Sequence, residues 1–133
     1  MTTQVFINLA VKDLEKSKAF FSALGYSFNP QFTNDSGACL VISDTIYAML
    51  LTENFFQGFT NKSLVDAKKA TEVLIALSMP NREAVEAMVA KAVAAGGRIY
   101  REPQDHGFMY AHSFEDLDGH QWEPFFMDPN HVQ

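Results

Sequence analysis

The topology of this chain follows from a stretch that occurs twice, as INLAV at residues 7–11 and as IALSM at residues 75–79. Each copy is an apolar run of strand length, and apolar residues at helical spacing follow it after a polar turn. A glycine then ends each helical stretch, Gly25 in the first half and Gly96 with Gly97 in the second. The pattern predicts a strand that leads into a helix at the same point of both halves.

Short apolar runs separated by turn residues follow each predicted helix. They lie at residues 26–32, 38–42 and 46–51 in the first half and at 98–101, 108–114 and 120–127 in the second. A loop is predicted at residues 103–107 and a tight turn at 116–119. Runs of this kind are typical of hairpin-linked antiparallel strands. Each half therefore predicts one βαβββ unit.

The two halves also align at their ends, where Asp44 corresponds to Asp118 and Met49 to Glu123. A repeat of this length predicts an α+β domain in which two βαβββ repeats form curved mixed sheets around a cup. The single domain has three parts: a first unit at about 4–52, a connector at about 53–70 that can hold a helical turn, and a second unit at about 71–127. The two units can pair within one chain or by exchange between chains.

The composition is that of one globular domain of 133 residues. There are 10 basic and 16 acidic residues, and the net charge of -6 disfavours a nucleic-acid partner. There is neither a charged-then-apolar leader nor an apolar run of about 18 residues, so we expect no export and no membrane span. The one cysteine, Cys39, lies in an apolar run. We expect it to be buried, as in a cytoplasmic protein.

Two segments carry a family resemblance. They are NLAVKDLEKS at residues 8–17, followed by Phe20, Phe21, Leu24 and Gly25, and FEDLDGHQWE at residues 114–123. Together they resemble the vicinal oxygen chelate superfamily, which contains glyoxalases, bleomycin resistance proteins and extradiol dioxygenases. The resemblance covers nearly the whole chain and implies the doubled βαβββ fold.

The same resemblance implies a metal site, because this superfamily typically holds a divalent metal between the first and last strands of each unit. Those positions fall on Phe6, Met49, Leu74 and Glu123. Phenylalanine and leucine have no lone pair to donate, and a methionine thioether suits soft copper(I). Only Glu123 can bind a hard divalent ion. We therefore expect no standard metal site and no cofactor, with a divalent metal that involves Glu123 as the alternative.

The candidate ligand-binding residues directed to the cup by family position or strand alternation are Phe6, Asn8, Met49, Leu74, His112 and Glu123. Trp122 is a further candidate, as an aromatic residue that can stack on a planar ligand. Glu123 is also the candidate catalytic residue, as a general base. A hydrogen-bonded core amide is an equal alternative for Asn8. His112 shares a strand face with Tyr110 and Phe114. If that face points inward, its imidazole enters the cup, and otherwise His112 lies on the surface.

Three functions are compatible with these candidates. The first is a glyoxalase or bleomycin-resistance-like homodimer that binds an aromatic or polar small molecule without the metal, and without nucleic-acid or membrane partners. The second is a metal-dependent lyase, isomerase or dioxygenase whose relocated site combines Glu123 with His112, His120 or His106. The third is a structural or regulatory dimer with a vestigial pocket. We expect the phenylalanines of the connector to cover the cup or a partner subunit: Phe55, Phe56 and Phe59.

Overall fold

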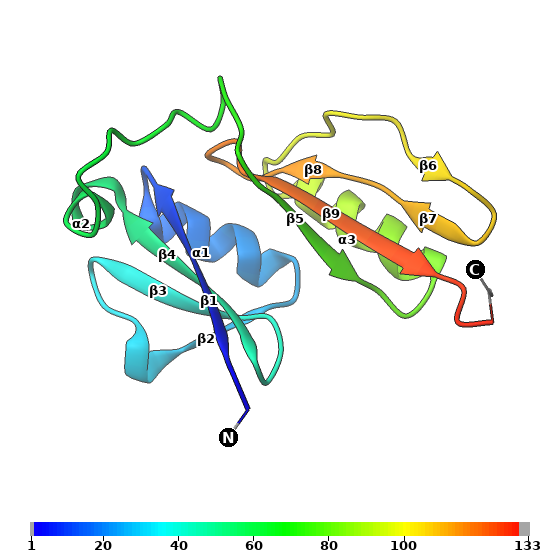
Figure 1. The fold of residues 1–133 in the computed structure, drawn as a ribbon, viewed down its shortest axis with the longest axis horizontal. Helices are drawn as coiled ribbons and strands as arrows, with labels where there is room; N and C mark the ends of the chain where they lie inside the picture. The colour runs from blue at the N-terminus through cyan, green and yellow to red at the C-terminus, as the bar shows by residue number, and fades with distance from the viewer. Residues whose placement is uncertain (1, 131–133) are drawn as a thin grey trace. The chain divides into compact units, whose positions relative to one another are not determined.

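The computed structural model describes residues 2–130, and the chain divides into two compact units, Met1–Val65 and Asp66–Gln133. Each unit consists of one mixed sheet with a helix on one of its faces (Figure 1). His131, which the sequence places in the tail, lies outside the described residues. No helix within residues 2–130 has both the length and the apolar character needed to cross a membrane.

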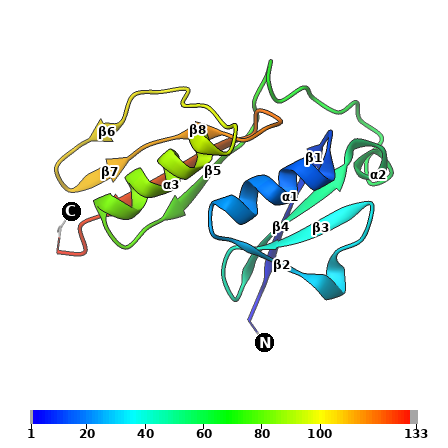
Figure 2. The same ribbon diagram turned by 180° about the vertical axis from the view of Figure 1, so that it is seen from behind.

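The first unit has a four-stranded sheet in the order β1-β4-β3-β2, with α1 packed on one face (Figure 2). Its elements are β1 (Val5–Val11), α1 (Leu14–Ala23), β2 (Ser27–Asn29), a 3-10 turn (Pro30–Phe32), β3 (Gly37–Val41) and β4 (Ile46–Thr52). The strand β1 runs parallel to β4, and β3 runs antiparallel to both of its neighbours. The Asp13 carboxylate accepts a hydrogen bond of 3.1 Å from the Lys16 amide and begins α1. Cys39 is fully buried, as expected.

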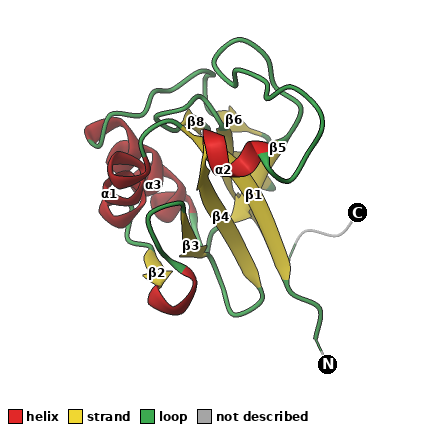
Figure 3. Cartoon of the chain, turned by 90° about the vertical axis from the view of Figure 1, so that its left-hand side faces the viewer, coloured by secondary structure: helices red, strands yellow, loops and turns green. Residues whose placement is uncertain are grey.

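The connector contains a short helix, α2 (Glu53–Gln57), at the end of β4 (Figure 3). The predicted helical turn is therefore confirmed. The Thr52 hydroxyl accepts a hydrogen bond from the Phe55 amide at 3.3 Å and caps the helix. The rings of Phe55 and Phe59 pack edge to face at 5.2 Å, yet the two residues are 43% and 70% exposed. The connector thus presents an apolar pair to solvent.

The second unit repeats the first around a central strand, β9. Its elements are β5 (Leu74–Ser78), α3 (Arg82–Ala94), β6 (Gln104–Asp105), β7 (Met109–Ala111), β8 (Phe114–Glu115) and β9 (Gln121–Met127). The strand β9 pairs in parallel with β5 and antiparallel with β7 and β8. The Asn81 side chain accepts a hydrogen bond of 2.8 Å from the Ala84 amide and begins α3.

Two predictions of where strands lie in the second unit were wrong. Of the predicted strand at 98–101, only Arg98 pairs, through two hydrogen bonds of 3.1 and 2.7 Å with Glu115. Residues 99–101 belong to no strand. The predicted loop at 103–107 instead contains β6, which pairs with β7.

The predicted strand at 108–114 is interrupted between β7 and β8, and Pro124 of β9 explains the gap. The His112 amide donates to the Pro124 carbonyl at 3.1 Å. Proline has no amide hydrogen, so it cannot return the second bond that this antiparallel pair requires. The ladder therefore breaks opposite a single residue.

The strand register confirms the alignment of the two halves. Phe6 lies opposite Tyr47 in the first unit, and Leu74 lies opposite Gln121 in the second. Two residues further along, Asn8 faces Met49 and Ala76 faces Glu123. The glycines that end the two helices, at positions 25 and 96, both have positive φ, 104° and 108°. The first strand, the helix and the last strand of the two units are thus equivalent.

An ion pair between Arg82 and Asp105 joins the start of α3 to β6, and it makes the stability of this unit depend on pH. The Arg82 guanidinium donates two hydrogen bonds of 2.8 Å to the Asp105 carboxylate, and the Gly107 amide donates a third of 2.9 Å. The Arg82 hydrogen bonds, followed by that from Gly107, lower the pKa of Asp105 to about 2. We expect Arg82→Gln to return this pKa toward the ordinary value near about 4.

The sign of the stability effect follows from the lowered pKa. The folded pKa lies below the unfolded one, so the stabilising contribution is present above about pH 4 and is lost as the pH falls toward about 2. Carboxyl titration by NMR measures the pKa directly. Lys18→Gln, which removes an ion pair with Glu15 on α1, should leave the Asp105 titration unchanged. A wild-type titration midpoint of Asp105 near the ordinary aspartate pKa would rule out this stabilising role of the Arg82–Asp105 ion pair.

Candidate functional site

The four positions that the superfamily uses for a metal lie on the open faces of the sheets, which are the faces not covered by α1 or α3. Phe6 and Met49 are diagonal neighbours on the open face of the first unit. Leu74 and Glu123 have the same relation in the second unit. Their chain neighbours Ala48, Leu50, Ile75 and Trp122 are buried on the helix side, as strand alternation requires.

The open face of the first unit is mainly apolar. The ring of Phe6 stacks on the ring of Tyr47, with their centroids 4.7 Å apart. Asn8 lies beside them, opposite Met49, and its amide nitrogen donates to the Phe6 carbonyl oxygen at 3.2 Å. Asn8 is exposed, so it is not a core amide. This face can stack against a flat or apolar group.

The open face of the second unit is polar around Glu123. Register places Gln121 on the same face of β9, and Ser113 opposite Glu123. The Ser113 Oγ and Gln121 Oε1 atoms are buried, and neither has a hydrogen-bond partner among the described residues. Buried polar atoms without partners are uncommon, because each costs about 1–3 kcal/mol. The face therefore offers oxygens that a bound molecule can satisfy.

Tyr100 borders the same group of side chains. Burial and, secondarily, the negative charge of Glu123 raise the pKa of its hydroxyl. The Ser113 hydroxyl lies near enough to oppose this shift, but the two make no hydrogen bond of normal geometry. A tyrosine hydroxyl is protonated at neutral pH, and this upward shift of its pKa keeps it so, which leaves Tyr100 a hydrogen-bond donor near Glu123.

The structure separates two of the sequence-predicted ligand residues from Glu123. Trp122 is 1% exposed on the helix side of β9, where its Nε1 donates to Asp116 Oδ2 at 3.0 Å. His112 does share a face with Tyr110 and Phe114, but that face is turned toward α3. His112 is thus neither beside Glu123 nor fully on the surface.

The residues present do not fit a divalent metal. Within either unit, the described residues contain no group of three His, Cys, Asp or Glu side chains that could hold one. The histidines of the alternative, relocated site are placed as follows: the ring of His106 lies near that of Phe108, with centroids 6.4 Å apart, in the loop after β6. The backbone amide of His120 donates to Asp116 in the closing turn. Neither histidine joins Glu123.

Sequence reasoning missed three residues of this face: Tyr100, Ser113 and Gln121. Gln121 could have been found, because it lies two residues before Glu123 on the same strand. Finding Ser113 required the pairing of β7 and β8 with β9. Tyr100 could be placed only once the course of the chain after Arg98 was known, because a strand had been predicted there and residues 99–101 form none.

Comparisons with known proteins agree with this fold. The glyoxalase, bleomycin resistance protein and dioxygenase family enzyme of Burkholderia phytofirmans is 15% identical, with 95% of this chain and 99% of that chain covered and a TM-score of 0.77. The fosfomycin resistance protein FosX of Listeria monocytogenes is 20% identical, with 95% and 93% covered and a TM-score of 0.70. At these identities the likeness concerns the fold alone.

Two further matches extend the likeness to sequence. The hypothetical protein SA1046 of S. aureus is 34% identical, with 95% of each chain covered and a TM-score of 0.79. The family model of the bleomycin resistance protein-like N-terminal region matches residues 3–43. The chain belongs to the vicinal oxygen chelate superfamily. The residues that match the family model include all of β1 and α1, the first strand and helix of the first repeat. No curated protein matches it.

Proposed function

We propose that this chain binds a small organic molecule on the open face of the second unit, without the divalent metal typical of its superfamily. One observation carries the proposal. Of the four metal positions only Glu123 holds a hard ligand, and it lies beside two buried oxygens that have no hydrogen-bond partner within residues 2–130, Ser113 Oγ and Gln121 Oε1.

The chemistry of this face favours a ligand that donates hydrogen bonds. The side chains of Glu123 and Gln121 present oxygens that accept hydrogen bonds. The exposed apolar side chain of Leu74 lies diagonal to Glu123 on the same face. An amine on an apolar or aromatic body matches this combination, since a charge-assisted hydrogen bond to a carboxylate is stronger than a neutral one.

A titration with benzylamine, followed by amide NMR, tests this proposal. We expect shifts at residues of β9 around Glu123, and about tenfold or more weaker binding to Glu123→Gln, because hydrogen bonds to charged groups contribute about 1.5–3 kcal/mol. Glu83→Gln makes the same change of charge on the exposed side of α3 and should bind as the wild type does. Equal binding to both variants would refute the role of Glu123.

We also propose that the chain forms a homodimer through the exposed aromatic pair of the connector, Phe55 and Phe59. Contiguous exposed apolar side chains often mark a protein interface. Sedimentation velocity should show a dimer for the wild type and a monomer for the Phe55→Ser, Phe59→Ser double variant. Phe32→Ser removes a phenylalanine that is 55% exposed elsewhere in the first unit and should remain dimeric. A double variant that stays dimeric would exclude this surface.

A further inference from the structure

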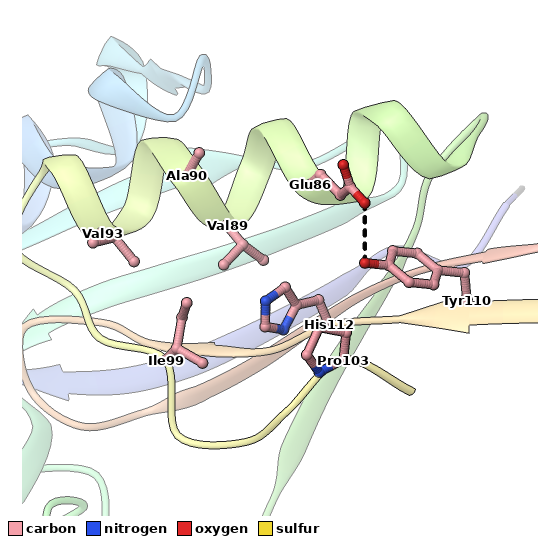
Figure 4. A pocket seen from close by; sticks show the side chains of 8 residues that line it. All are labelled: Glu86, Val89, Ala90, Val93, Ile99, Pro103, Tyr110 and His112. Atoms are coloured by element: carbon pink, nitrogen blue, oxygen red, sulfur yellow. Dashed lines mark hydrogen bonds between the residues drawn. The ribbon is translucent and has the colours of Figure 1, made fainter. Parts of the chain in front are cut away.

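A hollow lies on the helix side of the second sheet, between α3 and the segment that follows it (Figure 4). Its volume is about 530 Å³. We call it the α3 cleft, and its lining residues are Glu86, Val89, Ala90, Val93, Ile99, Pro103, Tyr110 and His112. Because it lies on the helix side of the sheet, it is separate from the open face that carries Glu123.

The walls of the α3 cleft are apolar and incompletely covered. Val89 is almost fully buried, but Val93 of the same helix and Ile99 across the cleft are 44% and 48% exposed. These two side chains approach the hollow from opposite walls in Figure 4. The volume falls within the range of about 300–1,000 Å³ typical of small-molecule pockets. The hollow can therefore enclose an apolar group of ring size.

One polar atom of the cleft is left unsatisfied. His112 Nδ1 is buried and has no hydrogen-bond partner among the described residues. Burial lowers the pKa of His112, so its imidazole is neutral at physiological pH. At the same cleft the Tyr110 hydroxyl donates to Glu86 at 3.1 Å, and the Arg82 guanidinium lies 4.9 Å from the Tyr110 ring centre. Among the described residues that line the cleft, His112 Nδ1 is thus the buried polar atom that a ligand can satisfy.

We propose that the α3 cleft is a second binding site, for a neutral molecule with an apolar ring and one hydroxyl group that hydrogen-bonds to His112 Nδ1. The ring lies between Val93 and Ile99. A carboxylate or phosphate is disfavoured, because Glu86 adds negative charge at the cleft and the neutral imidazole supplies no positive charge. The site is independent of ligand binding at Glu123.

A pair of isosteric probes, para-cresol and para-xylene, tests this site by NMR titration of the full chain. They differ by one hydroxyl in place of a methyl group. We expect both to shift resonances of Val89, Val93 and Ile99, and para-cresol to bind roughly threefold to tenfold more tightly, the gain of one neutral hydrogen bond. His112→Phe keeps a ring but removes the nitrogen, and should abolish the preference between the probes.

A blocking variant keeps the test decisive if His112→Phe does not fold. Ala90→Phe places a ring in the cleft from an exposed helical position and should abolish binding of both probes. Ala87→Phe makes the same change at an exposed position of α3 that does not line the cleft, and should bind as the wild type does. The proposal is overturned if Ala90→Phe binds the probes as well as Ala87→Phe does, or if the chemical shift changes map around Glu123 instead. It is also overturned if neither probe binds the wild type in a solution saturated with that probe.

Discussion

Replacing Asp116 by alanine should lower the free energy of unfolding by about 3–5 kcal/mol, among the largest effects of any single change in this chain. The Asp116 side chain, which is 5% exposed, accepts three hydrogen bonds in the turn at residues 116–119 that precedes β9. Its Oδ1 accepts hydrogen bonds of 3.0 Å from the amides of Asp118 and His120, and its Oδ2 accepts one of 3.0 Å from Trp122 Nε1.

Alanine at position 116 would remove the Asp116 acceptor from the buried indole N–H of Trp122 and both hydrogen bonds that hold the turn before β9. Trp122 is the one tryptophan of the chain, so urea denaturation followed by its fluorescence reports on this site directly. Asp35→Ala, an acidic residue in an exposed turn of the first unit, should change the stability by less than about 0.5 kcal/mol. Equal stability of the two variants would show that the Asp116 hydrogen bonds do not stabilise the fold.

Gly119→Ala should cost about 2–4 kcal/mol through a separate mechanism, backbone strain combined with a steric clash. Gly119 has a φ of 91°, which L side chains rarely adopt. An added Cβ would also lie 2.8 Å from the Lys68 backbone nitrogen and 2.9 Å from the Ala67 carbonyl carbon. That backbone cannot yield easily, because the Lys68 amide donates to the Asp66 carboxylate at 3.0 Å.

A matched glycine separates strain from the clash. Gly107 has a φ of 81°, but an added Cβ would meet nothing within 4 Å. Gly107→Ala should therefore cost only about 1–2 kcal/mol, the price of the strained backbone alone. The difference between the two variants in urea denaturation measures the contact between the closing turn and residues 67–68. If the two variants lose equal stability, the close approach of residues 67–68 to position 119 adds nothing to the cost of Gly119→Ala.

The sequence predicted the repeat correctly because both halves obey the same local rules. The strand before each helix, the helix and its terminal glycine depend on periodicity and turn chemistry, which short stretches of sequence carry. The errors in the second unit lie where pairing depends on distant residues. Of the strand predicted at 98–101 only Arg98 pairs, with the distant Glu115, and the break after Ala111 depends on Pro124 of another strand.

The candidate site was predicted in part for the same reason. Strand alternation alone relates Glu123 to Gln121 and separates it from Trp122, its immediate neighbour in the chain. The side of the sheet that His112 faces could not be read from its own strand, because both faces there carry apolar and polar residues. Only the packing of α3 shows that His112 turns toward the α3 cleft.

The central claim is that this superfamily member binds its ligand without a divalent metal. Equilibrium dialysis of the purified protein against manganese, nickel or zinc, followed by elemental analysis, tests it most directly. We expect well below one tightly bound ion per chain, with the same result for wild type and Glu123→Ala. One ion per chain in the wild type that is lost in Glu123→Ala would contradict it.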